Sequence, residues 1–402
     1  MIQTLTVNPI QVLAVSGLAV ALGIKLNRKI SFLRDLNIPA AIVGGLVFAT
    51  AALVLHNRLM NFEVDTTLRN VLMIAAFTTV GLNANLLAVG RGGIQVGFMT
   101  GLAIFGAVLQ AILGVGLAMA FGLHPLIGIV AGPMAFAGGP SNALAFGPMF
   151  EGLGITGATT TAVASATFGI VVAGLVAGWT GGALIRRSTP PFVPRHGTTD
   201  MDIKVPPGIF QPPGERATLL THVLLTTFAM GVGNLLILGL DRGGIVLPGF
   251  VGPMMVAVIL RNLDERTKWF GVHQETTEQI LSVVLPMFIA MSMLTLKLWE
   301  LHAIALPLLL ILSLQVVLTW LLCTLIAFPV LGGDYESAVM TAGFCGFMVG
   351  ITPNAVASME ELSSKFGSAP RAFLVVPLVG AVLLDLPLAV IITTFANFFR
   401  FH

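Results

Sequence analysis

Asp385 is the residue of this chain that most clearly calls for a chemical role. It lies in the stretch LVGAVLLDLPLAVII at residues 378–392, with at least ten apolar or small residues on its N-terminal side. A carboxylate at that depth of an apolar segment is costly unless it is paired or hydrated, so it marks a candidate functional site. It could bind Na⁺, carry a proton or neutralise the ammonium group of a substrate. The structural alternative is that it bonds backbone groups freed where Pro387 interrupts the helix.

A second candidate is the stretch GFCGFMVGITPNAVASM at residues 343–359, which is apolar but broken in its middle. The break contains Gly350, Thr352, Pro353 and Asn354, with Thr352 as the predicted N-cap and Pro353 as the first helical residue. Backbone groups left unpaired by such a break cost several kcal/mol each in hydrocarbon, so protein, water or a bound ion must satisfy them. We therefore predict a re-entrant hairpin at about residues 334–360 that lines a cavity.

The first half of the chain carries a matching stretch, AGPMAFAGGPSNALAFGPMF at residues 131–150. Its break comprises Gly138, Gly139, Pro140, Ser141 and Asn142. The two stretches align at a separation of about 211 to 213 residues, so that Gly138 meets Gly350 and Asn142 meets Asn354. Interrupted apolar segments at matching positions of two halves indicate a transporter substrate site near the bilayer midplane. The alternative is a pair of Gly-rich, tightly packed ordinary helices.

These residues define a predicted site with two kinds of ligand. The positive ends of the two short helices would receive a substrate carboxylate. The substrate-binding candidates are Gly139, Ser141, Asn142, Thr352, Pro353 and Asn354. Carbonyls at the breaks, the carboxylate and nearby hydroxyls or amides would bind Na⁺. The Na⁺-binding candidates are Asp385, Thr78, Thr79, Asn83, Gly138, Gly350 and Ser292. The alternative for Asn83 is that it caps a helix end.

The composition restricts the class of protein that can hold this site. The chain has 402 residues, of which 56% are hydrophobic and 9% charged, which is too little polar surface for a soluble globule. A net charge of +2 gives no argument for nucleic-acid binding. The seven histidines fall in loops or at span edges, so neither an enzyme nor a metal site beyond Na⁺ is expected. No cofactor is expected except Na⁺ as coupling ion.

The predicted fold is an all-α polytopic membrane protein with about ten transmembrane helices. The expected spans are 9–26, 39–55, 68–89, 94–123, 154–185, 219–240, 245–260, 276–298, 303–330 and 373–399. Residues 1–187 form a first repeat with a re-entrant loop at about 125–150, and residues 217–402 form a second. Five crossings per half is an odd number, so the second repeat inserts upside down and the topology is inverted.

Between the halves, residues 188–216 are too polar to span and too proline-rich to be helical. This linker and the loops at 25–34 and 261–268 collect most of the Lys and Arg residues. The positive-inside rule therefore places the linker in the cytoplasm and both termini outside. The start MIQTLTVNPI has no basic residue ahead of its apolar run, which argues against a cleaved signal peptide.

At these same stretches the chain resembles the bacterial sodium/glutamate symporter family. The matching pieces, in the order of the family, are TVGLNANL at 79–86, SATFG at 165–169, LKLWEL at 296–301, CGFMVGITPNAVA at 345–357 and FLVVPLVGA at 373–381. The resemblance implies a Na⁺-coupled importer of L-glutamate in the bacterial inner membrane. It also implies a homodimer with a scaffold part and a moving part that carries both re-entrant loops across in an elevator-type cycle.

The chain departs from this family at the two breaks, which form the tips of the predicted re-entrant loops. The family's first loop usually reads Gly-Gly-His-Gly-Thr where Gly138–Asn142 stands, and its second usually has His at Phe344 and Thr at Asn354. Three alternatives therefore stay open: a Na⁺-coupled carrier of another organic anion, a proton-coupled carrier with Asp385 as the proton site, and an ion channel. A channel requires a continuous pore, whereas an inverted repeat within one chain is typical of a transporter that works by alternating access.

Overall fold

The computed structural model describes residues 3–56, 58, 60–85, 93–187, 217–242 and 247–399, which form helices and two short strands joined by turns and loops. The first half contains β1 (Gln3–Val7), α1 (Pro9–Lys29), α2 (Ser31–Asp35), α3 (Ala40–Leu55), β2 (Met60–Val64), α4 (Thr67–Asn83), α6 (Gly93–Ala120), α7 (Pro125–Val130), α8 (Gly139–Gly152) and α9 (Ala158–Arg187). The predicted linker at 188–216 lies outside the described residues.

The second half consists of helices joined by turns and loops in its described part. It contains α10 (Ala217–Arg242), α11 (Val251–Thr267), α12 (Gln274–Met293), η1 (Leu298–Ile304), α13 (Ala305–Leu322), η2 (Cys323–Ala327), α14 (Phe328–Val330), α15 (Tyr335–Val349), α16 (Thr352–Phe366), α17 (Pro370–Leu378), η3 (Val379–Leu383) and α18 (Asp385–Phe398).

A helix occurs at each of the ten places where a span is expected. In the described part, six helices or helix runs are long and apolar enough to cross a membrane, namely α1, α6, α9, α10, α12 and the run from α13 to α14. The pair α17 and α18 passes the same test together but bends by 43°. Helices α3, α4 and α11 have 16 or 17 residues, at or below the lower end of what a bilayer requires. The chain is therefore a membrane protein, while the number of ten crossings stays a prediction.

Local signals in the sequence fix several helix ends. Asn8 caps α1 by accepting a hydrogen bond from the Gln11 backbone N–H, and the Gln11 side chain accepts one from the Asn8 N–H. Asp334 caps α15 by accepting from the Ser337 N–H at 2.8 Å. Gly367 ends α16 with φ at +116°, a conformation that glycine adopts without strain.

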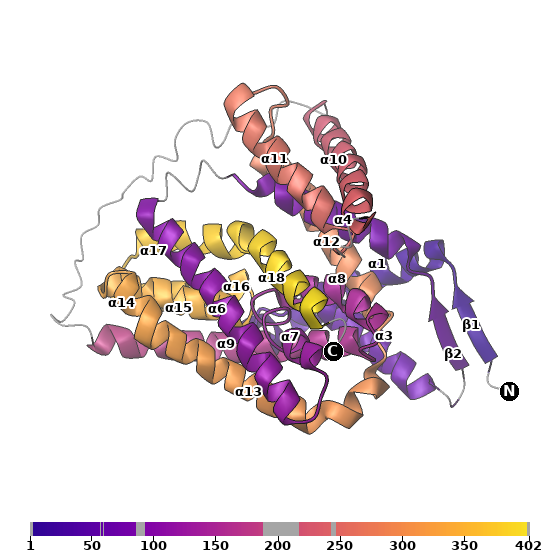
Figure 1. The fold of residues 1–402 in the computed structure, drawn as a ribbon, viewed down its shortest axis with the longest axis horizontal. Helices are drawn as coiled ribbons and strands as arrows, with labels where there is room; N and C mark the ends of the chain where they lie inside the picture. Colours follow the sequence, from indigo (N-terminus) through magenta and orange to yellow (C-terminus); the bar gives the residue numbers. More distant parts are fainter. Residues whose placement is uncertain are drawn as a thin grey trace.

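The two strands were not predicted. β1 and β2 pair in parallel from Gln3 with Met60 to Val7 with Val64, and they lie at one edge of the molecule beside the N-terminus (Figure 1). The first strand precedes α1 and the second follows α3, and these two helices pack against each other. The packing of α1 on α3 thus brings two short, partly β-branched segments into register, which their separate sequences do not reveal.

The helices pack as two groups, each drawn from both halves of the chain. The scaffold group, as we name it here, contains α1, α3, α4, α10, α11 and α12, which contact one another. The tip group contains α6, α7, α8, α9, α13, α15, α16, α17 and α18. Figure 1 shows that each group mixes early and late chain colours. Contacts between the groups are fewer and run mainly from α12 to α8 and from α11 to α18.

The tip group contains two helix–break–helix units, α7–α8 and α15–α16, at the places expected for re-entrant hairpins. The first break lies earlier than predicted, because turns already occupy residues 131–137 and α8 begins at Gly139. Pro133 explains this difference, since it has no N–H to continue α7. In the second unit the predicted cap was wrong by one residue: Ile351 is the N-cap, and α16 already begins at Thr352.

Candidate functional site

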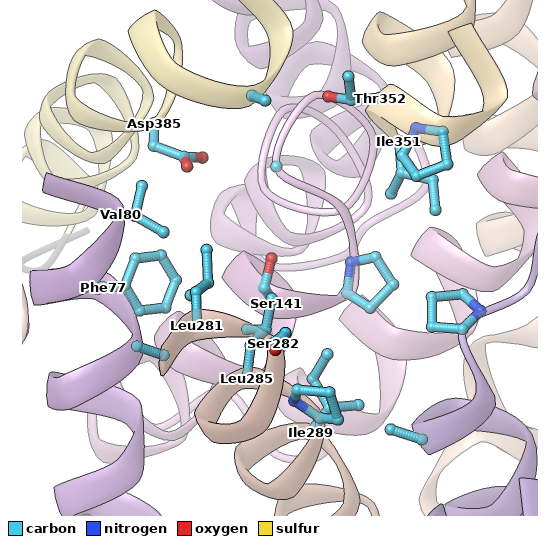
Figure 2. A pocket seen from close by; sticks show the side chains of 18 of the residues that line it. Phe77, Val80, Ser141, Leu281, Ser282, Leu285, Ile289, Ile351, Thr352 and Asp385 are labelled. Atoms are coloured by element: carbon cyan, nitrogen blue, oxygen red, sulfur yellow. The ribbon is translucent and has the colours of Figure 1, made fainter. Parts of the chain in front are cut away.

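A cavity of about 630 Å³ lies between the scaffold group and the tip group (Figure 2). The scaffold wall comes from α1, the start of α3, α4 and α12, and it is apolar apart from Ser282. The opposite wall comes from both breaks and from the turn between α17 and α18. Among the described residues that line this cavity, Asp385 is the ionisable one. A cation therefore finds a charged partner here, while an anion must rely on helix ends or on a bound cation.

The two breaks meet at this cavity. Gly139, at the start of α8, has φ at +63°, and a Cβ placed on it would lie 2.9 Å from the Ile351 side chain and 3.7 Å from the Gly350 carbonyl oxygen. Ser141 and Thr352 belong to the first turns of the two helices that follow the breaks. Figure 2 shows the hydroxyls of both residues directed toward the same open space. The N-terminal ends of α8 and α16 thus face one cavity.

Asp385 lies at the start of α18, directly after a π-helical turn and the 43° bend. Its half-buried carboxylate points toward the cavity (Figure 2) and accepts a hydrogen bond from Asn142 Nδ2 at 3.1 Å. The same amide nitrogen donates to the Gly138 carbonyl at 2.9 Å. The Asp385 carboxylate is therefore hydrogen-bonded to the first break. The structural alternative considered from the sequence was a bond to backbone groups near Pro387. This contact joins the end of the chain to its first half.

Asp385 also borders a second cavity of about 460 Å³ on its other side. This cavity is lined by α4, α6, α11 and the segment around α18, so it too lies between the scaffold group and the tip group. Its lining is almost entirely apolar and includes Gly81, Gly97 and Gly101. Val80 and Asp385 are the residues that both cavities share. Asp385 thus lies between the two cavities.

The second break is hydrogen-bonded to α9, whereas the first is bonded to Asp385. Asn354 is 2% exposed, and its Nδ2 donates to the Ile170 carbonyl of α9 at 2.7 Å. Its amide oxygen is buried without a hydrogen-bond partner among the described residues, as is the amide oxygen of Asn142. The two asparagines occupy equivalent positions in the aligned halves. One therefore bonds a carboxylate, and the other bonds a backbone carbonyl.

Thr78, Thr79 and Asn83 do not reach the cavity. The hydroxyls of Thr78 and Thr79 donate to their own helix, to the Ile74 carbonyl at 2.6 Å and the Ala75 carbonyl at 2.8 Å. Asn83 accepts a hydrogen bond from the Thr277 hydroxyl of α12. All three residues lie on α4, whose neighbours Phe77 and Val80 do line the cavity. Their role as ion ligands stays a prediction without a contact to the cavity.

Ser292 is fully buried in α12, and its hydroxyl oxygen has no partner among the described residues, but it does not line the cavity. The other predicted ion ligands, Gly138, Gly350 and Asp385, do line it. Of the substrate candidates, Ser141, Thr352 and Pro353 line the cavity. Gly139 lies between the tips, and Asn142 and Asn354 lie behind them.

Sequence reasoning missed the scaffold wall. Leu281, Leu285 and Ile289 of α12 face the cavity at intervals of four residues, with Ser282 and Pro286 beside them. Their spacing is that of one helix face, and Pro286 inside an apolar helix is a second signal. Both signals are common in membrane helices, so they do not distinguish a helix face that lines a cavity from one that packs against another helix.

Comparison with known proteins places this geometry in a family. The family model described as sodium/glutamate symporter matches residues 5–368. The chain is 38% identical over 388 residues to the sodium/glutamate symporter of Escherichia coli (strain K12), covering 94% of this chain and 95% of that protein. It is 33% identical over 391 residues to the sodium/glutamate symporter of Haemophilus influenzae, covering 95% of each. These relatives are transporters rather than enzymes. The chain belongs to the sodium/glutamate symporter family.

Proposed function

We propose that this protein imports L-glutamate by symport with Na⁺ across the bacterial inner membrane. The observation that carries the proposal is the single cavity at which two half-helix N-termini and one carboxylate meet. Unpaired N–H groups and the helix dipole favour an anion, whereas the carboxylate favours a cation. A site with both features suits the joint transport of a carboxylate and Na⁺. The names of the relatives supply the identities of the two solutes.

The substrate carboxylates are received by the tips. Because the described lining contains neither Lys nor Arg, the N-terminal turns of α8 and α16 are the donors that an anion meets. Ser141 and Thr352 add hydroxyl donors directed into the cavity. The apolar wall of α12 packs against the methylene groups of the substrate. Pro140 has no N–H, so one backbone donor is missing at the first tip.

Na⁺ binds beside Asp385, where a carboxylate and carbonyl groups of the first break come together. Glutamate carries a net charge of −1, so one Na⁺ per cycle would gain nothing from the membrane potential. With two Na⁺, a tenfold gradient supplies roughly 1.4 kcal/mol per ion, and a potential of about 100 mV adds roughly 2.3 kcal/mol. That sum permits accumulation of about several thousandfold, so the cycle uses more than one Na⁺.

The movement is of the elevator type. The cavity lies between the scaffold group and the tip group, and the tip group carries both breaks and Asp385. Displacement of the tip group along the scaffold group would carry the whole site from one face to the other. The arrangement of each group from both halves supports an inverted repeat. A homodimer through the scaffold group would hold it fixed in the membrane.

The orientation has its own test. We expect both termini and the end of α10 near Asp241 to face outward, and residues 188–216 to face the cytoplasm, because Lys and Arg are concentrated on the linker side. Single cysteines introduced in the linker and near Asp241 should differ in labelling by an impermeant reagent added to intact cells. Labelling of the linker under those conditions would contradict the inverted topology.

Uptake into proteoliposomes tests the proposed function. We expect labelled L-glutamate to accumulate when a Na⁺ gradient is imposed, and a pH gradient alone to drive no accumulation. A proton-coupled carrier would give the reverse result. A channel would equilibrate the solute without accumulation under either gradient. Saturable uptake of another anion, with no uptake of glutamate, would contradict the substrate but leave the coupling mechanism intact.

A further inference from the structure

The oxygen of the Asn354 side chain is buried and has no hydrogen-bond partner among the described residues. Its orientation is fixed, because the amide nitrogen donates to the Ile170 carbonyl at 2.7 Å, and a carbonyl oxygen accepts hydrogen bonds but cannot donate one to the amide oxygen. Turning the amide around would bring two oxygens together. An amide oxygen left unpaired in the interior costs about 1–3 kcal/mol. The position therefore calls for a ligand that an oxygen can bind.

One backbone oxygen at the same break also lacks its usual donor, whereas the neighbouring Met348 carbonyl accepts a hydrogen bond from Gln110 Nε2 at 2.9 Å. In an uninterrupted helix the Val349 carbonyl would accept from the N–H of residue 353, but that residue is Pro353, which has none. The Val349 oxygen lies against Gly169 of α9, since a Cβ on Gly169 would be 2.2 Å from it. The C-terminal end of α15 carries the negative end of the helix dipole, and it favours a cation.

We propose that the second break holds a Na⁺ site built without a charged residue, in which Asn354 Oδ1 and the Val349 carbonyl oxygen at the end of α15 are the ligands. Hard cations of this kind take carbonyl and amide oxygens, and broken helices in transporters offer them in this way. Of the polar contacts at this break, the amide nitrogen already anchors Asn354 to α9. The proposal rests on the proposed function, because it assigns a place to a second coupling ion.

The first break provides the contrast. Asn142 is the equivalent residue, and its amide nitrogen is held by two acceptors, Asp385 at 3.1 Å and the Gly138 carbonyl at 2.9 Å. The carboxylate neutralises a Na⁺ bound there. At the second break no described residue does so, and the ion keeps its full positive charge beside the N-terminus of α16. That charge attracts the substrate carboxylate, so occupancy of the neutral site and binding of the substrate reinforce each other.

Binding of radioactive Na⁺ to the purified full-length protein, without substrate, tests this site. Asn354→Leu keeps the volume but removes the oxygen. We expect this variant to lose one of about two bound Na⁺, or to bind that ion at least tenfold more weakly. Asn354→Thr keeps an oxygen and a donor, so it should retain more Na⁺ binding than Asn354→Leu does. If Asn354→Leu does not fold, Asn354→Ala, which also lacks the oxygen, takes its place.

The matched control is Asn27→Leu. Asn27 has the same pattern, with Nδ2 donating to the Ile38 carbonyl at 2.9 Å and a buried oxygen without a partner, but it joins α1 to the start of α3 and does not line the cavity. Wild-type number and affinity of Na⁺ in Asn354→Leu would overturn the inference and leave the proposed function standing. An equal loss in Asn27→Leu would also overturn it. Absence of Na⁺ binding by the wild-type protein would contradict the proposed function itself.

Discussion

The two breaks share a pattern of glycine, proline and asparagine residues, but they differ in the groups to which they are hydrogen-bonded. Pro140 and Pro353 follow the breaks at equivalent places, and Asn142 and Asn354 follow the prolines. Yet α7 has six residues and α15 has 15, because Pro133 interrupts the first unit where the second has no proline. The glycine and proline pattern therefore sets where each chain segment breaks. It does not set what the freed groups bind.

Each tip is hydrogen-bonded to a helix from the other half of the chain. The first tip bonds Asp385 of the last helix, whereas the second tip bonds Ile170 of α9, which belongs to the first half. Each tip is thus held by the final span of the opposite half. The equivalent of Asp385 in the first half is Gly174, so the charge is present on one side of the pseudo-repeat only. On the proposed assignment of the two Na⁺ ions, one site is therefore charged and the other neutral.

The largest expected effect comes from removing the charge at the first tip. Asp385→Asn preserves size and can still bond Asn142, but it leaves a bound Na⁺ without its counter-charge. We expect Na⁺-driven glutamate uptake to fall at least a hundredfold, while the variant remains folded in the membrane. Asp241→Asn, at the exposed end of α10, is the matched control and should transport normally. Wild-type uptake by Asp385→Asn would return this residue to a packing role.

The attachment of the second tip can be disturbed without removing a polar group. In Gly169→Ala the new Cβ would lie 2.2 Å from the Val349 oxygen, so the break must move away from α9. We expect uptake to fall more than tenfold, with weaker Na⁺ dependence. Gly174→Ala is five residues further along the same helix and meets nothing within 4 Å, so it should behave as wild type. Equal activity of the two variants would show that the tip is not held where we place it.

A third variant tests whether the tips must touch. Gly139→Ala puts a methyl group 2.9 Å from the Ile351 side chain and also strains a residue with φ at +63°, which costs about 1–2 kcal/mol. Gly154→Ala has the same backbone strain, with φ at +92°, but no neighbour within 4 Å. We expect severalfold lower glutamate affinity in Gly139→Ala than in Gly154→Ala. Identical KM values would mean that contact between the tips does not shape the substrate site.

A fourth prediction concerns selectivity among analogues of glutamate. The tips offer Ser141 and Thr352 hydroxyls and no basic side chain among the described lining, so discrimination depends on a few neutral donors. One unpaired carboxylate oxygen costs about 1–3 kcal/mol, or about ten- to a hundredfold in affinity. We expect aspartate, glutamine and C4–C5 dicarboxylates to compete with labelled L-glutamate within that range. Competition by none of them would indicate a more specific donor set than this one.

The breaks, the buried carboxylate and the helical class were predictable from sequence, because glycine, proline and a lone Asp385 have few uses inside apolar segments. The number of crossings was harder, since α3 and α4 are short for a bilayer. Thr78 and Thr79 illustrate the limit at the level of side chains. A hydroxyl in a helix can face a site or its own backbone, and here both donate to carbonyls four residues earlier.

The scaffold wall and the partners of the two asparagines could not be predicted for a related reason. Leu285 on α12 has the same character whether it packs against a helix or lines a cavity, and only the placement of the tip group decides. The bond from Asn142 to Asp385 joins residues 243 positions apart in the chain. No local pattern reports a contact over that separation, although the alignment of the halves singled out Asn142 and the lone carboxylate in an apolar segment singled out Asp385.

Parallel measurement of radioactive Na⁺ and labelled L-glutamate entering the same proteoliposomes tests the central claim most directly. Two unlike ion sites, one charged at the first tip and one neutral at the second, predict about two or more Na⁺ per glutamate and uptake that carries net positive charge inward. We expect an inside-negative potential to stimulate uptake, as electrogenic coupling requires. A ratio of one Na⁺ per glutamate with no response to the potential would contradict the account.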